Sequence, residues 1–196
     1  MKALLGLSKV IDSITAFVGK AAAWLVLVAV LVSAGNAVVR KVFSISSNAW
    51  LELQWYLFGA VFMLAAAYTL QNNEHIRIDI VFGMQSKKVQ DRIDLFGHLF
   101  FLLPFTVLMV WLFTPYVIRS FNIQEHSANA GGLIIWPAKS MLLAGFVLLL
   151  AQAISEIIKR IAIMRGIIDD PNPHQSGHAP LEEDEVEIAR GDIHNA

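Results

Sequence analysis

Long apolar runs separated by short polar links dominate this chain. The best defined run opens on the aromatic cluster Trp50 to Tyr56, stays apolar through Tyr68 and turns polar at Gln71. A helix of about 20 apolar residues crosses the ~30 Å hydrocarbon core of a bilayer at ~1.5 Å per residue. Three other runs have similar length. The pattern therefore predicts an all-α membrane protein with four spanning helices, over about 21–43, 50–70, 93–117 and 133–158.

Residues 1–20 follow a different pattern. Their apolar positions recur at helical spacing, and the lysines fall between them: Leu4, Leu7, Ile11, Ile14 and Val18 against Lys2 and Lys9. This periodicity predicts an amphipathic helix. It either lies in the membrane interface or forms the cytoplasmic end of the first spanning helix. No small-residue cleavage site follows a short apolar core, so we do not interpret it as a signal peptide.

The first link, residues 44–48, is so short that the helices on either side of it must be antiparallel neighbours. Arg40 and Glu52 then lie at the same side of the membrane. A carboxylate near the hydrocarbon is costly without a partner, and Arg40 can supply one. Two interpretations stay open, an Arg40–Glu52 ion pair and two charges solvated separately among the headgroups.

Two prolines mark the later helices. Pro104 lies inside the third apolar run, where it removes a backbone hydrogen bond and predicts a kink. Pro137 follows Trp136 in the first turn of the fourth helix, where a missing N–H is harmless. His98 is the only histidine within a predicted span, and we expect it to be hydrogen bonded inside the bundle.

Composition supports a membrane protein. The 196 residues are 56% hydrophobic and only 16% charged, against ~25% charged in soluble domains. The absence of cysteine excludes disulfides and thiolate chemistry. Eight of the sixteen acids but one of the fifteen bases lie beyond Ile168, so a basic body carries an acidic tail. The prolines and acids of residues 166–196 predict a disordered segment.

The distribution of bases predicts the orientation. Ten bases lie in the two terminal segments and the second link: Lys2, Lys9, Lys20, Arg77, Lys87, Lys88, Arg92, Lys159, Arg160 and Arg165. Four lie at the opposite side: Arg40, Lys41, Arg119 and Lys139. Because cytoplasmic segments carry the excess of lysine and arginine, both termini are expected in the cytoplasm.

The sequence presents no set of catalytic residues. It has no nucleophile elbow and no glycine-rich phosphate loop. With His98 alone in the spans, a bis-histidine haem site within one chain is not expected. His75 and His126 fall on opposite sides of the membrane and cannot share a metal. We expect no enzymatic activity, no cofactor and no nucleic-acid partner.

Several local motifs together resemble a known family. They are Glu52 with Trp55-Tyr56, then Gly59 and Ala65 to Tyr68, the turn His75-Ile76-Arg77-Ile78-Asp79, and Ser127 to Leu133 followed by Trp136-Pro137. Over residues 10–165 the chain resembles the DctQ-type small membrane subunit of tripartite ATP-independent periplasmic (TRAP) transporters. The block from Ser127 looks like the branch associated with 2-oxo acids. The acidic tail is not part of the family pattern.

The resemblance implies a scaffold in the bacterial inner membrane. In this family the small subunit binds a large membrane subunit, which holds substrate and sodium and moves by an elevator motion, while a periplasmic binding protein delivers an organic acid. Two other functions are alternatives to the scaffold. A membrane anchor of a respiratory oxidoreductase would bind haem, and a small autonomous exporter would need an acid deep in a helix.

Seven residues are candidates for contact with these partners or with lipid. They are Glu52 and Trp55 in the second helix, His75, Arg77 and Asp79 in the turn after it, and Glu125 and Asn129 in the third link, residues 119–132. Loops on rigid frames commonly carry recognition. The third link is therefore either a docking site for the binding protein or a passive connector, and both interpretations stay open.

Overall fold

This computed structural model describes residues 1–44, 47–73, 82 and 85–169. Its helices are α1 (Lys2–Phe43), α2 (Asn48–Gln71), α4 (Lys87–Gly97), the π-helical turn η1 (His98–Leu102), α5 (Leu103–Asn122) and α6 (Trp136–Met164). Because α4, η1 and α5 form one continuous helix, the described residues contain four helices that are long and apolar enough to cross a membrane. The predicted all-α fold with four spanning helices is confirmed. The tail beyond residue 169 lies outside the described residues.

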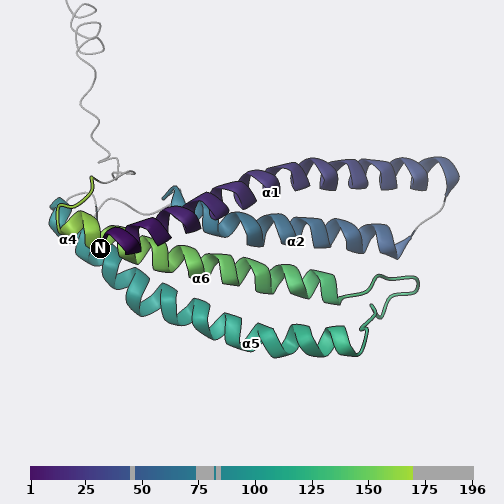
Figure 1. Cartoon of the computed structure of the whole chain (residues 1–196). Coiled ribbons are helices and arrows are strands. Elements are labelled where there is room, and N and C mark those ends of the chain that lie inside the picture. Colours follow the sequence, from purple (N-terminus) through teal and green to yellow (C-terminus); the bar gives the residue numbers. More distant parts are fainter. Residues whose placement is uncertain (45–46, 74–81, 83–84, 170–196) are drawn as a thin grey trace, which may run out of the picture.

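The four long helices run alongside one another, and the ends of the molecule differ (Figure 1). The α1–α2 and α5–α6 links lie at one end, which we call the loop end. The N-terminus, α4 and the last turns of α6 lie at the other, which we call the α4 end. Helices α1, α2 and α6 pack against one another, whereas α5 packs on α6 alone among the other spans.

Small residues allow the helices to approach closely. A Cβ at Gly19 of α1 would lie 2.5 Å from the Cβ of Tyr68 in α2, and one at Gly145 of α6 would lie 2.7 Å from the Cβ of Met63. Ala29 of α1 and Ala67 of α2 are also fully buried. Lipid gives no hydrophobic driving force between helices, so such close packing is a main source of their association.

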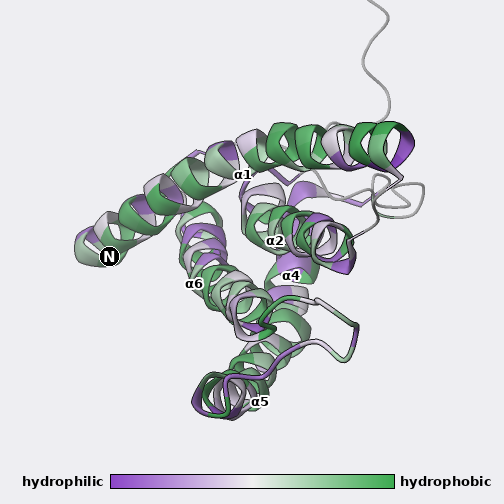
Figure 2. Ribbon diagram, turned by 90° about the vertical axis from the view of Figure 1, so that its right-hand side faces the viewer, coloured by the Kyte–Doolittle hydropathy of each residue, from purple (hydrophilic) through white to green (hydrophobic). Residues whose placement is uncertain are grey.

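Helix α1 is continuous through residues 20 and 21. It continues for 42 residues, about 63 Å at 1.5 Å per residue, twice the ~30 Å hydrocarbon core. Its first half contacts α6 through Ser8, and Gly19 then reaches Tyr68 of α2. The first half therefore crosses from one helix to the other, as the view along the bundle shows (Figure 2).

The third spanning helix accommodates Pro104 by widening one turn. The N–H of Leu103 donates to the carbonyl of His98, five residues back, which defines the π-helical turn. This turn lies immediately before the proline, whose ring would otherwise clash with the carbonyl of Phe100. The disturbance expected at Pro104 thus takes the form of a π-helical turn. Pro137 lies in the first turn of α6, as predicted.

Candidate functional site

Glu52 is the centre of a hydrogen-bonded cluster at the loop end. It lies in the first turns of α2 and is only 5% exposed. Its carboxylate accepts hydrogen bonds from the hydroxyl of Ser127, from Nδ2 of Asn129 at 2.8 Å and from the backbone N–H of Leu133 at 2.7 Å. Hydrogen bonds to an ionised acceptor are about twice as strong as neutral ones. We call these four residues the Glu52 clamp.

The connection after α5 is shaped to form this clamp. Ser127 N–H donates to the Leu133 carbonyl at 2.9 Å, which folds the connection back on itself. Gly132 lies at the closest point, where a Cβ would be 2.5 Å from the Cβ of Ser127 and 2.8 Å from Oε1 of Glu52. Only glycine fits there without displacing the carboxylate or the serine. Close packing at Gly132 therefore explains why the third link ends in glycine.

The Arg40–Glu52 ion pair, one of the two open interpretations, is not found among the described residues. Arg40 is exposed near the end of α1, and the Glu52 carboxylate accepts its hydrogen bonds from the connection between α5 and α6. The physical reason is that neutral donors satisfy the carboxylate inside the fold without the cost of desolvating a guanidinium. Neither open interpretation, the ion pair or solvation among the headgroups, included these donors.

Glu125 is held on the adjacent part of the connection. Its carboxylate accepts a hydrogen bond from Nζ of Lys139 in α6 at 2.5 Å, and the same ammonium lies 3.9 Å from the centre of the Tyr116 ring. The Lys139 ammonium lowers the pKa of Glu125 below its ordinary value. The candidates Glu52, Glu125 and Asn129 are thus brought together at the loop end, with their polar groups directed at residues of the same chain.

A second polar cluster joins α1 and α6 at the α4 end. Nε2 of the fully buried Gln152 donates to Asp12 and to Glu156, both at 2.9 Å. Lys159 bridges the same two acids, at 3.2 Å from Asp12 and 2.6 Å from Glu156. The sequence predicted that the fourth span ends at about residue 158, beside Lys159, but predicted no role for Asp12 or Gln152. The spacing of Gln152, Glu156 and Lys159 was a usable signal, because residues four and three positions apart lie on one helix face.

Arg160 makes the link from α6 to the third spanning helix. Its guanidinium lies 3.0 Å from Asp91 and 3.2 Å from Asp94, and all three side chains are buried. Lys87 adds a 3.5 Å contact to Asp91 within α4. The turn that contains the candidates His75, Arg77 and Asp79 lies outside the described residues.

The two polar layers fit the two surfaces of a membrane. Lys139 and Glu156 are seventeen residues apart in α6, or ~26 Å at 1.5 Å per residue, close to the ~30 Å hydrocarbon core. Between them the helices expose large apolar side chains, such as Phe62 of α2, Trp111 of α5 and Val147 of α6. Polar side chains at each end therefore fix the helices to one another while leaving the apolar middle for lipid or a membrane partner.

Comparison with known families agrees with this architecture. Residues 28–162 match the family model described as tripartite ATP-independent periplasmic transporters, DctQ component. The chain belongs to the DctQ family. No curated protein and no solved structure matches it. As a DctQ component, it is a small permease subunit of a TRAP transporter, a system that also has a large membrane subunit and a periplasmic binding protein. DctQ components are generally non-catalytic, and the match does not favour a respiratory membrane anchor.

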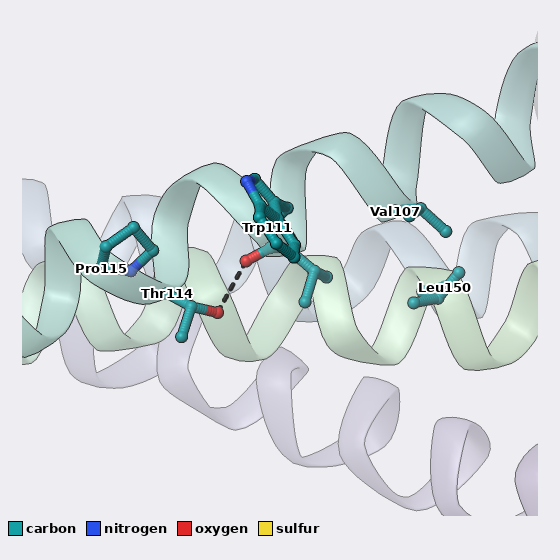
Figure 3. A pocket seen from close by; sticks show the side chains of 6 residues that line it. Val107, Trp111, Thr114, Pro115 and Leu150 are labelled. Carbon is teal, nitrogen blue, oxygen red and sulfur yellow. Dashed lines mark hydrogen bonds between the residues drawn. The ribbon is translucent and has the colours of Figure 1, made fainter.

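On this DctQ subunit, two exposed aromatic surfaces are available to a membrane partner. Trp55 in α2 is 66% exposed, and Trp111 in α5 is 77% exposed. Trp111 borders an open groove of about 450 Å³ between α5 and α6 (Figure 3), with the lining residues Val107, Val110, Trp111, Thr114, Pro115 and Leu150. The Thr114 hydroxyl donates to the Val110 carbonyl at 2.6 Å, which leaves the groove lining almost wholly apolar. The groove is suited to hydrophobic contacts rather than to a polar substrate.

Proposed function

We propose that this DctQ chain is the static scaffold of a sodium-coupled transporter for an organic acid. In this proposal, the large membrane subunit holds the substrate and sodium and moves by an elevator motion. The small subunit holds the non-moving part of that partner in place. The periplasmic binding protein delivers the substrate from outside. The family membership supports the assembly. The pairing of the chain's charged residues with one another supports the scaffold role.

The observation that carries the proposal is that the acids of the described helices are all engaged within the chain. They are Asp12, Glu52, Asp91, Asp94 and Glu156, and each has a hydrogen bond or ion pair to another residue of this protein. A transport path needs polar groups that can exchange partners with an ion or substrate. Groups already committed at both ends of the bundle favour a structural role.

We infer that the large subunit covers part of the exposed apolar surface between the polar layers. Trp55 and the α5–α6 groove are the candidate contacts, because large aromatic side chains dominate interface energetics. His75, Arg77 and Asp79 are proposed to hold the segment after α2 against the same partner. This assignment predicts that the interface is mainly hydrophobic, with charged residues near its cytoplasmic edge.

We further propose that the chain lies in the bacterial inner membrane with both termini in the cytoplasm. The support is the excess of bases, ten against four, on the side of the termini and the second link. The Glu52 clamp then faces the periplasm. Contact with the binding protein, if it occurs at this end, would use exposed groups such as Asn122 and His126 rather than Glu125, which is paired with Lys139.

Co-purification tests the proposed function directly. The chain carries an affinity tag at its C-terminus, is purified from its native membrane in mild detergent, and its partners are identified by mass spectrometry. We expect one large multi-pass membrane protein in fixed stoichiometry. A chain with Trp55→Ala and Trp111→Ala lacks the two proposed aromatic contacts and should recover less of that protein than the parent chain does. Recovery of a haem-containing oxidoreductase, visible by its absorbance, would overturn the proposal in favour of the anchor function.

A further inference from the structure

Three lysines form one exposed line along the first half of α1. Lys9 follows Lys2 by seven residues, and Lys20 follows Lys9 by eleven. At 3.6 residues per turn these steps are about two and three whole turns. The helix is continuous from Lys2 to Phe43, and all three lysine side chains are exposed. The three charges therefore share one side of the helix.

A neighbouring side of this segment, roughly a quarter of a turn from the lysine line, is fixed by packing, so the lysine line cannot rotate inward. The hydroxyl of Ser8 lies 2.7 Å from that of Ser155, and Asp12 is paired with Lys159. Gly19 sits directly against the Tyr68 side chain. These contacts hold the buried side of α1 on α6 and α2 and leave the lysines facing outward.

An apolar line runs beside the lysines. Val10, Phe17 and Trp24 follow one another at steps of seven residues, and Phe17 and Trp24 are 74% and 71% exposed. On a helix, this line is displaced from the lysine line by less than a quarter of a turn. The segment therefore presents a positive strip and an aromatic strip next to each other.

The segment crosses the α4 end of the bundle obliquely, from α6 to α2 (Figures 1 and 2). Asp12 lies beside Lys159 near the end of α6, and Gly19 lies beside Tyr68, three residues before the end of α2 at Gln71. Both helices end at this side of the molecule (Figure 1). Residues 8–19 thus stay near one polar layer, which is where lipid headgroups lie if the apolar middle spans the membrane.

We propose that the first half of α1 is a binding surface for anionic phospholipid headgroups. Lys2, Lys9 and Lys20 contact the lipid phosphates, while Phe17 and Trp24 enter the outer part of the acyl layer. The aromatic strip beside the lysines favours lipid over the acidic tail of this chain or an acidic soluble protein, because neither of those offers an apolar medium. The proposal depends on the membrane location of the chain and not on its transport partners.

The test uses the full chain alone, reconstituted in vesicles. Because the chain has no cysteine, Ser13→Cys gives a single fluorescent reporter on the exposed side of this segment. Quenching by brominated phosphatidylglycerol is compared with quenching by brominated phosphatidylcholine at equal mole fraction. We expect a preference for phosphatidylglycerol, with each lysine contributing at most roughly fivefold, and a lower preference at high salt.

Three variants make the result specific. Lys2→Gln, Lys9→Gln and Lys20→Gln together should remove most of the preference, and the same three positions changed to arginine should keep it. The matched control, Lys41→Gln, Lys88→Gln and Arg92→Gln, removes three exposed bases elsewhere and should also keep it. The proposal is overturned if the glutamine variant retains the parent preference, or if the control loses as much.

Discussion

Nδ2 of Asn129 donates a hydrogen bond to the carboxylate of Glu52 at 2.8 Å, although 77 residues of chain separate the two. This bond ties the connection between α5 and α6 to the start of α2. Asn48 makes a second hydrogen bond between the same two segments, from its Nδ2 to the carbonyl of Ala130 at 2.9 Å. The connection is thus part of the frame, and its shape depends on a residue in another helix.

Replacing Glu52 should loosen the whole loop end. Glu52→Ala leaves the N–H of Leu133 and the side chains of Ser127 and Asn129 without their acceptor, and buried donors without partners destabilise a fold. We expect a melting temperature several degrees lower in detergent and faster proteolysis within residues 123–135. Glu52→Gln, which keeps one oxygen acceptor, should lose less.

Asp169→Ala is the control for this experiment, since Asp169 is an exposed carboxylate. It should melt like the parent protein. Equal melting of Glu52→Ala and Asp169→Ala would show that the clamp contributes nothing to stability.

Gly132→Ala tests the closest approach within the clamp. The new Cβ would be 2.8 Å from Oε1 of Glu52 and 2.5 Å from the Cβ of Ser127, so one of these groups must move. Overpacking of this kind costs typically ~1–3 kcal/mol. Thermal unfolding should show the loss. Gly35→Ala is the matched control, because a Cβ there meets nothing within 4 Å and alanine favours a helix; a similar loss in both variants would contradict the packing argument.

The pairing of Glu125 with Lys139 should make stability depend on acid pH. The pKa of Glu125 is lower in the folded protein than its ordinary value of 4.5, so the unfolded state binds more protons as pH falls. The stabilisation is complete above pH 4.5 and is lost as pH falls through the lower folded value. The melting temperature of Glu125→Gln should therefore be below that of the parent at neutral pH and approach it in acid. A difference that stays constant with pH would argue against an ionised pair.

Single cysteines can establish the orientation, because the native chain has none. With both termini in the cytoplasm, an impermeant thiol reagent added to intact cells should label Ser47→Cys and Ala128→Cys but not Ser176→Cys. Ala128 is preferred to Asn129, whose side chain holds Glu52. Labelling of Ser176→Cys from outside would reverse the proposed topology.

The sequence predicted the spanning helices well because long apolar runs leave few alternatives. The expected apolar spans of about 50–70 and 93–117 lie inside longer helices, Asn48–Gln71 and Lys87–Asn122. Lys87 and Arg92 continue the third helix beyond its apolar part, since charged residues at a membrane surface are compatible with helix. Both open interpretations of residues 1–20 were helical, and the sequence did not decide between them.

The polar clusters were harder to predict because they join residues far apart in the chain. The Asp12–Gln152 contact spans 140 residues, and no local pattern fixes which faces of α1 and α6 meet. For Glu52, the sequence left open an ion pair with Arg40 and separate solvation of the two charges. Neither interpretation included the hydroxyl, the amide and the backbone N–H that satisfy the carboxylate.

Uptake by reconstituted subunits tests the scaffold function most directly. Proteoliposomes contain this chain alone, the co-purified large subunit alone, or both, and uptake of the organic acid is measured with binding protein outside and an inward sodium gradient. The scaffold account predicts sodium-dependent uptake only when both membrane subunits are present, and none by this chain alone. Transport by this chain alone, or full transport by the large subunit without it, would contradict the account.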